Sequence, residues 1–304
     1  MWQSTLTSMV SSILLSKGMK RLLIILFAIV LLAGCQKESA VDTSATVTYT
    51  LVPDVKFDVK SEGESPIVSS SVNSLSCLVY HFKNGNYEYI PEMSLFVDII
   101  DPFDIKVPVK LFKDQKYRLI FVAQHAIKSA QRTVSYAYTI SDGIMSVNEM
   151  ATITTGDQLE AFAYVDDEVC PSNSSESKRI TLERIVSQVN LSTSTSKENL
   201  PTSLNVSVSG TPSSYDIVNN NYSDETTTLT FSNISVPGDE VSVSGNEYRR
   251  LSTLYFLGSN QIDLTLTRNT EDQESFTINK VNTKVNYKTN IAGNILPGNT
   301  QQVY

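Results

Sequence analysis

The sequence contains very few of the side chains that perform catalysis or bind metals. Its 304 residues include two histidines, three cysteines and one tryptophan. Neither His81 nor His125 lies in an HExxH pattern, and the sequence has no CxxC pair, no GxSxG segment and no GxxxxGK[ST] loop. Both histidines are therefore interpreted as strand residues that face solvent. These absences argue against zinc, serine-nucleophile and nucleotide-phosphate sites, and we expect no enzymatic activity, no metal and no cofactor.

Positive charge is also scarce. The chain has 24 Lys and Arg residues against 32 Asp and Glu residues, which gives a formal net charge of −8. The first 34 residues hold three basic residues and no acidic one, so the rest of the chain carries −11. Such a surface repels phosphates, and we expect no nucleic-acid partner. Asp98, Asp101 and Asp104 suggest a calcium site, but the EF-hand spacing is missing and a solvated loop is favoured.

The longest apolar run lies near the N-terminus and ends at a cysteine. Lys20 and Arg21 precede the unbroken apolar segment 22–32, and Ala33, Gly34 and Cys35 follow it. A charged start, an apolar centre and a small-residue site are typical of a secretory signal. The segment 32–35 resembles a bacterial lipobox. That resemblance predicts cleavage between Gly34 and Cys35, with acylation of the Cys35 thiol.

Residues 1–34 are therefore interpreted as a lipoprotein signal peptide and residues 35–45 as a polar tether. Residues 1–18 either precede the natural start at Met19 or extend the charged region of the signal. Two alternatives remain open. One is a plain secretory signal in which the cysteine is coincidental. The other is a transmembrane helix, although the apolar run is short for a bilayer core, which needs about 20 residues. The lipoprotein interpretation holds the mature chain to a membrane by lipid, and the pair Lys37-Glu38 resembles the signals that send some lipoproteins to the cell surface.

Two cysteines remain beyond the leader. Cys77 lies in the apolar run 76–80, and Cys170 precedes Pro171. A Cys77–Cys170 disulfide is possible in an oxidising compartment. The favoured interpretation is two unpaired thiols with Cys77 buried, since a chain of this size does not need a disulfide framework.

Beyond the tether, the pattern is that of an all-β protein. Short alternating segments rich in Val, Ile, Thr and Tyr are separated by turn signals, which favours β-sandwiches. A tight hairpin is predicted around Asn84-Gly85 and a short helix over 124–131. The acidic and serine-rich segment 166–177 predicts a break. We expect an N-terminal β-sandwich domain over 46–170, a linker over 171–179 and a C-terminal β-sandwich domain over 180–304.

Several tyrosines alternate along the predicted strands of the first half, namely Tyr87, Tyr89, Tyr136 and Tyr138. Such a ladder either packs within a sheet face or forms an exposed platform that binds sugar rings. A surface glycan-binding lipoprotein is therefore the alternative function. Trp2, the one tryptophan, would be lost with the signal peptide, which weakens this alternative.

Three segments resemble the fimbrillin superfamily, whose members build type V pili. Residues 117–123, YRLIFVA, resemble a strand of fimbrillin first domains. Residues 182–190, LERIVSQVN, resemble the strand that opens the second domain. Residues 285–296, VNYKTNIAGNIL, resemble the stretch N-Y-[RK]-T-N-I-x-G-N-x-L near the end of family members.

The resemblance implies two transthyretin-like β-sandwich domains in tandem and a structural or adhesive role in a pilus, as a minor, tip or anchor subunit. Its implied partners are membrane lipid, other pilus subunits and a host or bacterial surface ligand. It also implies proteolytic removal of the first strand, 47–51, so that a neighbour's strand fills the groove.

Two features depart from that pattern. Family cleavage often follows an arginine, but Lys56 and Lys60 are the basic residues of the expected cleavage region. The sequence ends eight residues after Leu296, without the donor strand with which many members continue, which favours a tip or accessory subunit over a shaft subunit. Absence of cleavage would instead favour a lipid-held anchor.

Overall fold

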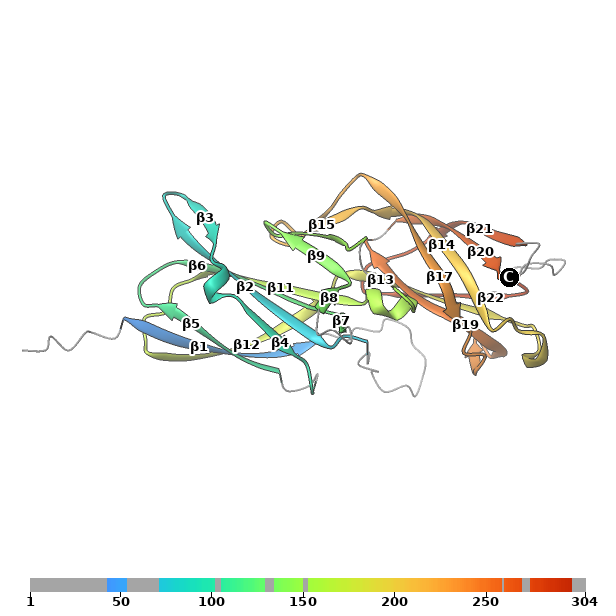
Figure 1. Ribbon diagram of the computed structural model, residues 1–304, viewed down its shortest axis with the longest axis horizontal. Helices are drawn as coiled ribbons and strands as arrows, with labels where there is room; N and C mark the ends of the chain where they lie inside the picture. The colour runs from blue at the N-terminus through green and yellow to red at the C-terminus, as the bar shows by residue number, and fades with distance from the viewer. Residues whose placement is uncertain are drawn as a thin grey trace, which may run out of the picture. The chain divides into compact units, whose positions relative to one another are not determined.

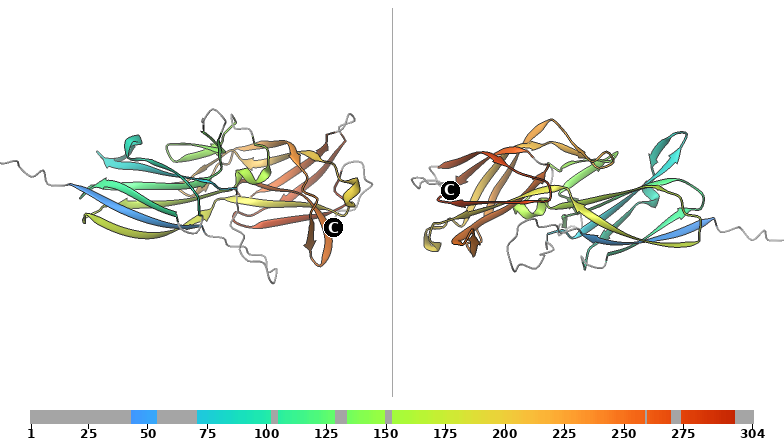
Figure 2. Two further views of the ribbon diagram at one scale, coloured as in Figure 1. Left: turned by 60° about the horizontal axis from the view of Figure 1, so that its bottom comes forward. Right: turned by 180° about the vertical axis from the view of Figure 1, so that it is seen from behind.

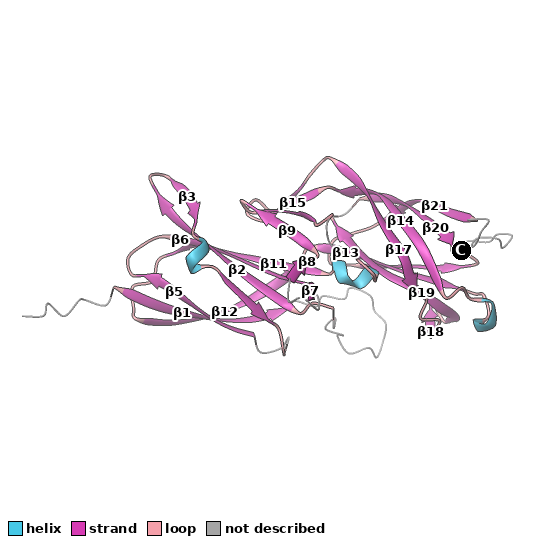
Figure 3. Ribbon diagram, in the orientation of Figure 1, coloured by secondary structure: helices cyan, strands magenta, loops and turns pink. Residues whose placement is uncertain are grey.

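The computed structural model describes residues 43–53, 71–101, 105–128, 134–149, 153–258, 260–269 and 274–296. Over these residues the protein is all-β, as the sequence predicts (Figure 3). The helical elements there are three short 3-10 turns, η1 (Pro91–Met93), η2 (Gly156–Leu159) and η3 (Lys197–Asn199). No helix in the described ranges is long and apolar enough to span a bilayer.

The first half of the chain forms one eight-stranded sheet in the order β3-β2-β6-β11-β12-β1-β5, with β4 also paired to β2 (Figure 1). β1 is antiparallel to β5 but parallel to β12. The strands are β1 (Ser44–Pro53), β2 (Ser74–Lys83), β3 (Asn86–Tyr89), β4 (Leu95–Asp98), β5 (Ile105–Phe112), β6 (Tyr117–Gln124), β11 (Ala161–Val169) and β12 (Ser175–Arg184).

The edge strand β5 shows how alternation fixes the faces of this sheet. Its residues alternate strictly between buried and exposed, with Val107 and Val109 inside. Lys106, Pro108 and Lys110 occupy outward positions between them. Lysine and proline on an edge strand discourage pairing with another chain, so β5 ends the sheet.

The second half forms a sandwich of two four-stranded sheets, ordered β18-β19-β13-β22 and β17-β14-β20-β21. Its strands are coloured from yellow to red in Figure 2. Both sheets contribute buried side chains, such as Leu254 and Leu264, to one apolar cluster. The strands are β13 (Val186–Thr193), β14 (Ser203–Pro212), β17 (Thr226–Ser235), β18 (Glu240–Val243), β19 (Asn246–Leu257), β20 (Gln261–Arg268), β21 (Ser275–Asn282) and β22 (Lys288–Gly293).

A small sheet joins segments from both halves. It has the order β16-β15-β10-β9, with β9 (Tyr138–Ser141), β10 (Ile144–Val147), β15 (Ser214–Asp216) and β16 (Asn221–Tyr222). β7 (Ala126–Lys128) and β8 (Val134–Tyr136) form a separate pair. The larger apolar cluster likewise draws residues from both halves, from Leu78 to Leu296. Packing is tight where they meet, because a Cβ added to Gly156 would lie 2.3 Å from the carbonyl oxygen of Thr253.

The hairpin prediction is confirmed. β2 and β3 are joined at Asn84 and Gly85, whose φ angles of +51° and +88° are those that a tight hairpin turn requires. Glycine at the second position adopts this conformation without a steric penalty.

Three sequence expectations are wrong. Residues 124–128 of the expected helix lie at the end of β6 and in β7 instead. The acidic residues 166–168 continue β11, and residues 175–179 of the expected linker begin β12. The acidic segment is a strand because β11 pairs with β6, and the serine-rich segment is a strand because β12 pairs with β1. Pairing with these buried strands overrides the low intrinsic β-propensity of both segments. β12 therefore belongs to the first sheet as far as Arg184. The division of the chain into two domains remains a proposal.

Candidate functional site

The sites predicted from the sequence lie outside the described residues. Gly34 and Cys35, at the expected processing and acylation site, precede residue 43, and Lys56 and Lys60 fall between 53 and 71. β1 lies between these two sites in the sequence and is described in full. It is therefore the structural element that bears most directly on them.

β1 lies deep inside the first sheet. Val47, Tyr49 and Leu51 are completely buried, and their backbones pair with β12 on one side and β5 on the other. Their alternation matches the inner face of the sheet, where they contact a cluster that includes Val107 and Phe121. Removal of this strand would uncover a long apolar groove with unpaired backbone groups on both sides.

One polar contact fixes β1 in its register. The Tyr49 hydroxyl donates a hydrogen bond to Asp166 Oδ2 over 2.6 Å, and Lys178 Nζ lies 2.8 Å from the same oxygen. Burial and the hydrogen bond to Asp166 raise the pKa of Tyr49 above its usual value, so the phenol stays protonated and remains a donor. A shift of β1 by one residue would lose this contact and invert the faces of the strand.

A second feature is a surface that we name the hairpin face. Its side chains are Phe82, Tyr87, Tyr89, Lys116, Arg118, Asp167 and Glu168. They come from the β2–β3 hairpin and the neighbouring strands β6 and β11. Phe82 and Tyr89 remain 36% and 39% exposed, although both are large aromatic residues.

Rings and cations are interleaved on the hairpin face. The Phe82 and Tyr87 rings make an edge contact, with centroids 5.1 Å apart. The Arg118 guanidinium lies 4.1 Å from the Tyr87 centroid, and Lys116 Nζ lies 5.0 Å from that of Phe82. Both distances are within the range of cation–π attraction. Tyr89 rests on the buried ring of Tyr80 at 5.3 Å.

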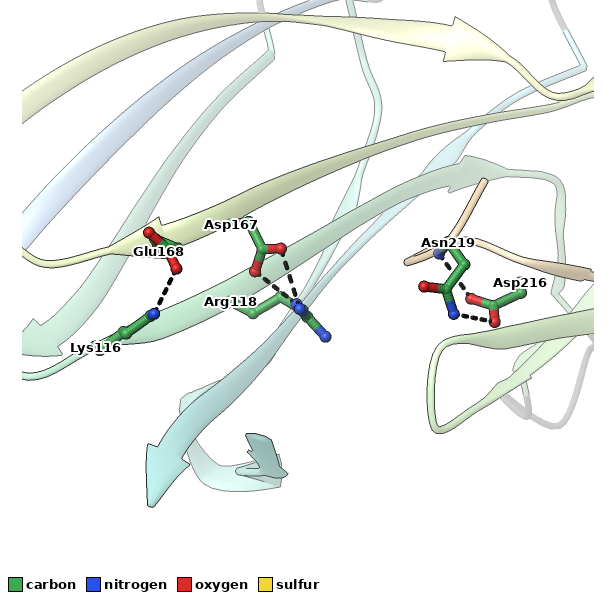
Figure 4. A network of polar contacts seen from close by, with 6 residues as sticks. All are labelled: Lys116, Arg118, Asp167, Glu168, Asp216 and Asn219. Atoms are coloured by element: carbon green, nitrogen blue, oxygen red, sulfur yellow. Dashed lines mark hydrogen bonds and ion pairs between the residues drawn. The ribbon is translucent and has the colours of Figure 1, made fainter. Parts of the chain in front are cut away.

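Carboxylates from β11 complete the hairpin face (Figure 4). Asp167 accepts two hydrogen bonds from Arg118, one from Nε at 2.7 Å and one from Nη2 at 3.0 Å. Lys116 Nζ lies 2.6 Å from Glu168 Oε1. The bidentate bonds from Arg118 hold the pKa of Asp167 below its ordinary range, so this carboxyl stays ionised at neutral pH.

A β-bulge in β11 places Glu168 on the same side of the sheet as Asp167, which already faces Arg118 by the alternation of the strand. Asp166 lies opposite Leu119 and Val169 lies opposite Tyr117, so β11 has one more residue than β6 between these pairs. Glu168 has a φ angle of +60°, which is uncommon for a residue other than glycine. The extra residue turns Glu168 outward and lets Val169 fill the core position instead.

The turn between β15 and β16 adds a further polar group near the hairpin face. Asp216 accepts hydrogen bonds from Asn219, from the backbone N–H at 3.0 Å and from Nδ2 at 2.7 Å (Figure 4). The Asp216 charge acts on Arg118 and contributes to the raised pKa of that guanidinium, to which the hydrogen bond to Asp167 contributes most. The second half of the chain thus supplies part of the polar surroundings of this surface.

Both histidines lie in the described part of the chain and contact neighbouring protein groups. His81 stacks on Tyr117 with ring centroids 4.9 Å apart, and its Nε2 lies 3.2 Å from Gln115. His125 was expected to face solvent but is half-buried. Its Nδ1 forms a hydrogen bond with the Ser71 carbonyl, which holds the ring against the protein. No group of three or more potential metal ligands occurs in the described part of the chain, which includes Asp98 and Asp101 but not Asp104.

The thiols and the tyrosine ladder have clear positions. Cys77 and Cys170 are unpaired, with Cys77 buried and Cys170 exposed, as favoured from the sequence. The predicted tyrosines do not form one ladder. Tyr138 is buried and donates a hydrogen bond to the Leu159 carbonyl at 2.6 Å, while Tyr136 lies near Phe96 on another edge. Only Tyr87 and Tyr89 of the four lie on the hairpin face.

A buried ion pair lies between the two halves. Arg184 Nη2 of β12 is 2.5 Å from Glu160 Oε1, and both side chains are almost fully buried. The guanidinium also lies over the rings of Phe162, from the first half, and Tyr255, from the second. Ser71, the first described residue after 53, donates a hydrogen bond to the other Glu160 oxygen. These contacts connect the segment that follows the expected cleavage region to both halves.

Sequence reasoning identified neither Arg118 nor Asp167 as a site residue. Arg118 stands in an otherwise apolar strand, YRLIFVA, so its outward position could have been derived from the alternation. Asp167 lies opposite Arg118 because β11 continues through the acidic residues, and the outward position of Glu168 depends on the bulge, which has no short sequence signature here. The acidic residues instead predict a break when the sequence is taken alone.

No model of a known protein family matches the chain, and no curated protein sequence does. Its structure is similar to that of the fimbrial anchor protein Mfa2 from Porphyromonas gingivalis, at 14% identity and a TM-score of 0.40, over 82% of this chain and 90% of that one. A candidate polysaccharide-binding protein from Bacteroides thetaiotaomicron aligns at 12% identity with a TM-score of 0.47, over 84% of this chain and 92% of that one. A candidate adhesin from Bacteroides ovatus aligns at 11% identity with a TM-score of 0.44, over 86% of this chain and 95% of that one.

Proposed function

We propose that this chain is a surface lipoprotein of the fimbrillin type, acylated on Cys35 and serving as a structural or adhesive pilus component. The observation that carries the proposal is the apolar leader that ends in Ala33, Gly34 and Cys35. Cys35 precedes the start of β1 by only nine residues. Lipid on this thiol would therefore hold the first sheet close to the membrane, through the short polar segment 35–43, because residues 44–45 of the expected tether already belong to β1.

The three segments of the fimbrillin resemblance support the same proposal. Residues 117–123 lie in β6, and residues 182–190 run from the end of β12 into β13. Residues 285–296 include β22, which pairs in parallel with β13. Each segment thus contributes a strand to a sheet, in the order that the resemblance predicts. The transthyretin-like topology of the two sandwiches is part of this proposal.

Assembly through strand addition is the finer part of the proposal. β1 fills a groove between β12 and β5 with alternate buried side chains, which is the geometry of an added strand. If cleavage occurs near Lys56 or Lys60, β1 leaves and a strand from a neighbouring subunit takes its place. If no cleavage occurs, β1 stays and the chain serves as a lipid-held anchor.

The test is acylation in cells that produce the whole chain. The wild type is expected to incorporate labelled palmitate, and the Cys35→Ser variant is expected to lose the label. Cys170→Ser is the matched control, because it removes an exposed thiol elsewhere and should keep the label. Equal labelling of the wild type and the Cys35→Ser variant, or no label in either, would refute the lipoprotein proposal.

Protease treatment of intact cells tests the surface location. The acylated chain is expected to be digested without lysis of the cells. The N-terminus of the recovered chain then distinguishes the two finer roles. An acylated Cys35 indicates an anchor, whereas a new start between residues 57 and 70 indicates an assembling subunit.

A further inference from the structure

We propose that the hairpin face is a binding site for a neutral glycan. The inference deepens the adhesive part of the proposed function. Its test uses the isolated protein, so a failure here leaves the acylation of Cys35 untouched. The proposal rests on three properties of this surface, namely exposed rings, planar polar groups beside them and balanced charge.

The exposed rings are the first property. Phe82 and Tyr89 expose more than a third of their surface on a hairpin, although aromatic rings of this size are usually covered. Tyr87 belongs to β3 of the hairpin, and the Arg118 guanidinium lies over its ring. A sugar ring has apolar C–H groups on its faces, which can cover an aromatic ring and remove it from water.

The planar polar groups are the second property. The Arg118 guanidinium is held between the Tyr87 ring and the Asp167 carboxylate, which accepts bonds from its Nε and one Nη2 hydrogen. A guanidinium has five N–H donors, so the donors that do not bond to Asp167 can bond to a ligand. The Asp167 side chain is 48% exposed and its oxygens can accept further bonds from hydroxyl groups. Together they present fixed donors and acceptors at the edge of the rings.

The third property is charge balance, which determines the class of ligand. The two cations of the hairpin face are each paired with a carboxylate, and Asp216 adds a further negative charge nearby. A polyanion is therefore disfavoured, all the more because the whole chain is acidic. An uncharged ligand with apolar faces and many hydroxyls fits both the rings and the paired charges.

The surface is also organised before any ligand arrives. The Asn84-Gly85 turn fixes the hairpin, and the bulge with its positive φ at Glu168 fixes the direction of the carboxylates. Unusual backbone of this kind is often found where a side chain must be aimed at a ligand. A preorganised surface loses less conformational entropy on binding.

The test is native affinity electrophoresis of the isolated chain in gels that contain yeast mannan, arabinoxylan or galactomannan, with polygalacturonate as the charged comparison. At least one neutral polysaccharide is expected to slow the wild type. Tyr89→Ala and Phe82→Ala should each weaken that retardation about tenfold, because the loss of one aromatic contact lowers the binding affinity by about this factor. Phe112→Ala is the matched control, because this ring is 52% exposed on β5 and lies outside the hairpin face.

Asp167→Asn is the second variant, since it keeps the rings and the shape of the side chain. It should weaken retardation with no change in circular dichroism. The proposal is overturned if no neutral polysaccharide slows the wild type, if polygalacturonate alone does so, or if Phe112→Ala weakens binding as much as Tyr89→Ala.

Discussion

The outer faces of the two halves differ sharply in chemistry. In the described residues, every exposed large apolar side chain lies in the first half, from Phe82 to Ile144. The outer face of β17, β14, β20 and β21 instead carries neutral polar pairs. Examples are Thr265 with Thr277 at 3.3 Å and Thr267 with Ser275 at 2.9 Å.

This contrast in surface chemistry is consistent with different roles for the two halves. Hydroxyl and amide pairs satisfy one another across neighbouring strands and give a stable face with little affinity for a partner. Exposed rings leave apolar surface in water, which marks a candidate interaction site. We therefore propose that the first half carries binding and membrane attachment and that the second half supports it.

The largest expected effect comes from β1. Tyr49→Ala removes a fully buried ring and should lower the free energy of unfolding by about 3–5 kcal/mol. Tyr49→Phe should cost only about 1–2 kcal/mol, since it keeps the ring and loses the hydrogen bond to Asp166. Urea denaturation of both variants measures the difference. Equal losses of unfolding free energy in the two variants would contradict the conclusion that packing of the Tyr49 ring, rather than its hydrogen bond, provides most of its contribution to stability.

The buried pair between the halves comes next. Arg184→Ala should cost about 3–5 kcal/mol because it leaves Glu160 buried without its partner. The double variant Arg184→Met with Glu160→Gln should recover most of that loss. Arg250→Ala is the matched control, since its pair with Asp239 is exposed, and it should cost about 1 kcal/mol at most. Thermal denaturation distinguishes these outcomes, and a double variant as unstable as Arg184→Ala would refute the account.

The two thiols give a smaller contrast. Cys77→Ser buries a hydroxyl in an apolar cluster and should cost about 1–3 kcal/mol, whereas Cys170→Ser at the surface should cost almost nothing. Burial raises the pKa of the Cys77 thiol to about 12, so iodoacetamide at pH 8 should modify Cys170 and spare Cys77 in the native Cys35→Ser form. Rapid modification of both thiols would show that β2 is less protected than we conclude.

The smallest effect concerns Asp167. Because its pKa is lowered in the folded state, its contribution to stability is present above the unfolded value of about 4 and is lost as the pH falls through the lower folded value. The side chain is half exposed, so the loss should stay below about 1 kcal/mol. Asp167→Asn should be slightly less stable than the wild type at pH 6 and equal to it near pH 2. A constant difference over this range would contradict the ion pair with Arg118.

Much of the fold could be predicted from the sequence because many strands have one buried face. The alternation of 105–112 and the Asn84-Gly85 turn follow directly from local chemistry. β12 could not be recognised from the polar start of its sequence, SESKRITLER, because its position depends on pairing with β1, more than 120 residues earlier. The hairpin face was missed for a similar reason, since it depends on a bulge and on the pairing of the β2–β3 hairpin with β6 and of β6 with β11, which lie far apart in sequence.

The most direct test of the central claim is the mass of the N-terminal peptide of the chain recovered from the membranes of producing cells. The account predicts that the peptide begins at Cys35 and carries fatty acid on that residue, with the Cys35→Ser variant released from the membrane fraction. An intact leader, or a mature chain that begins at an unmodified Cys35, would contradict it.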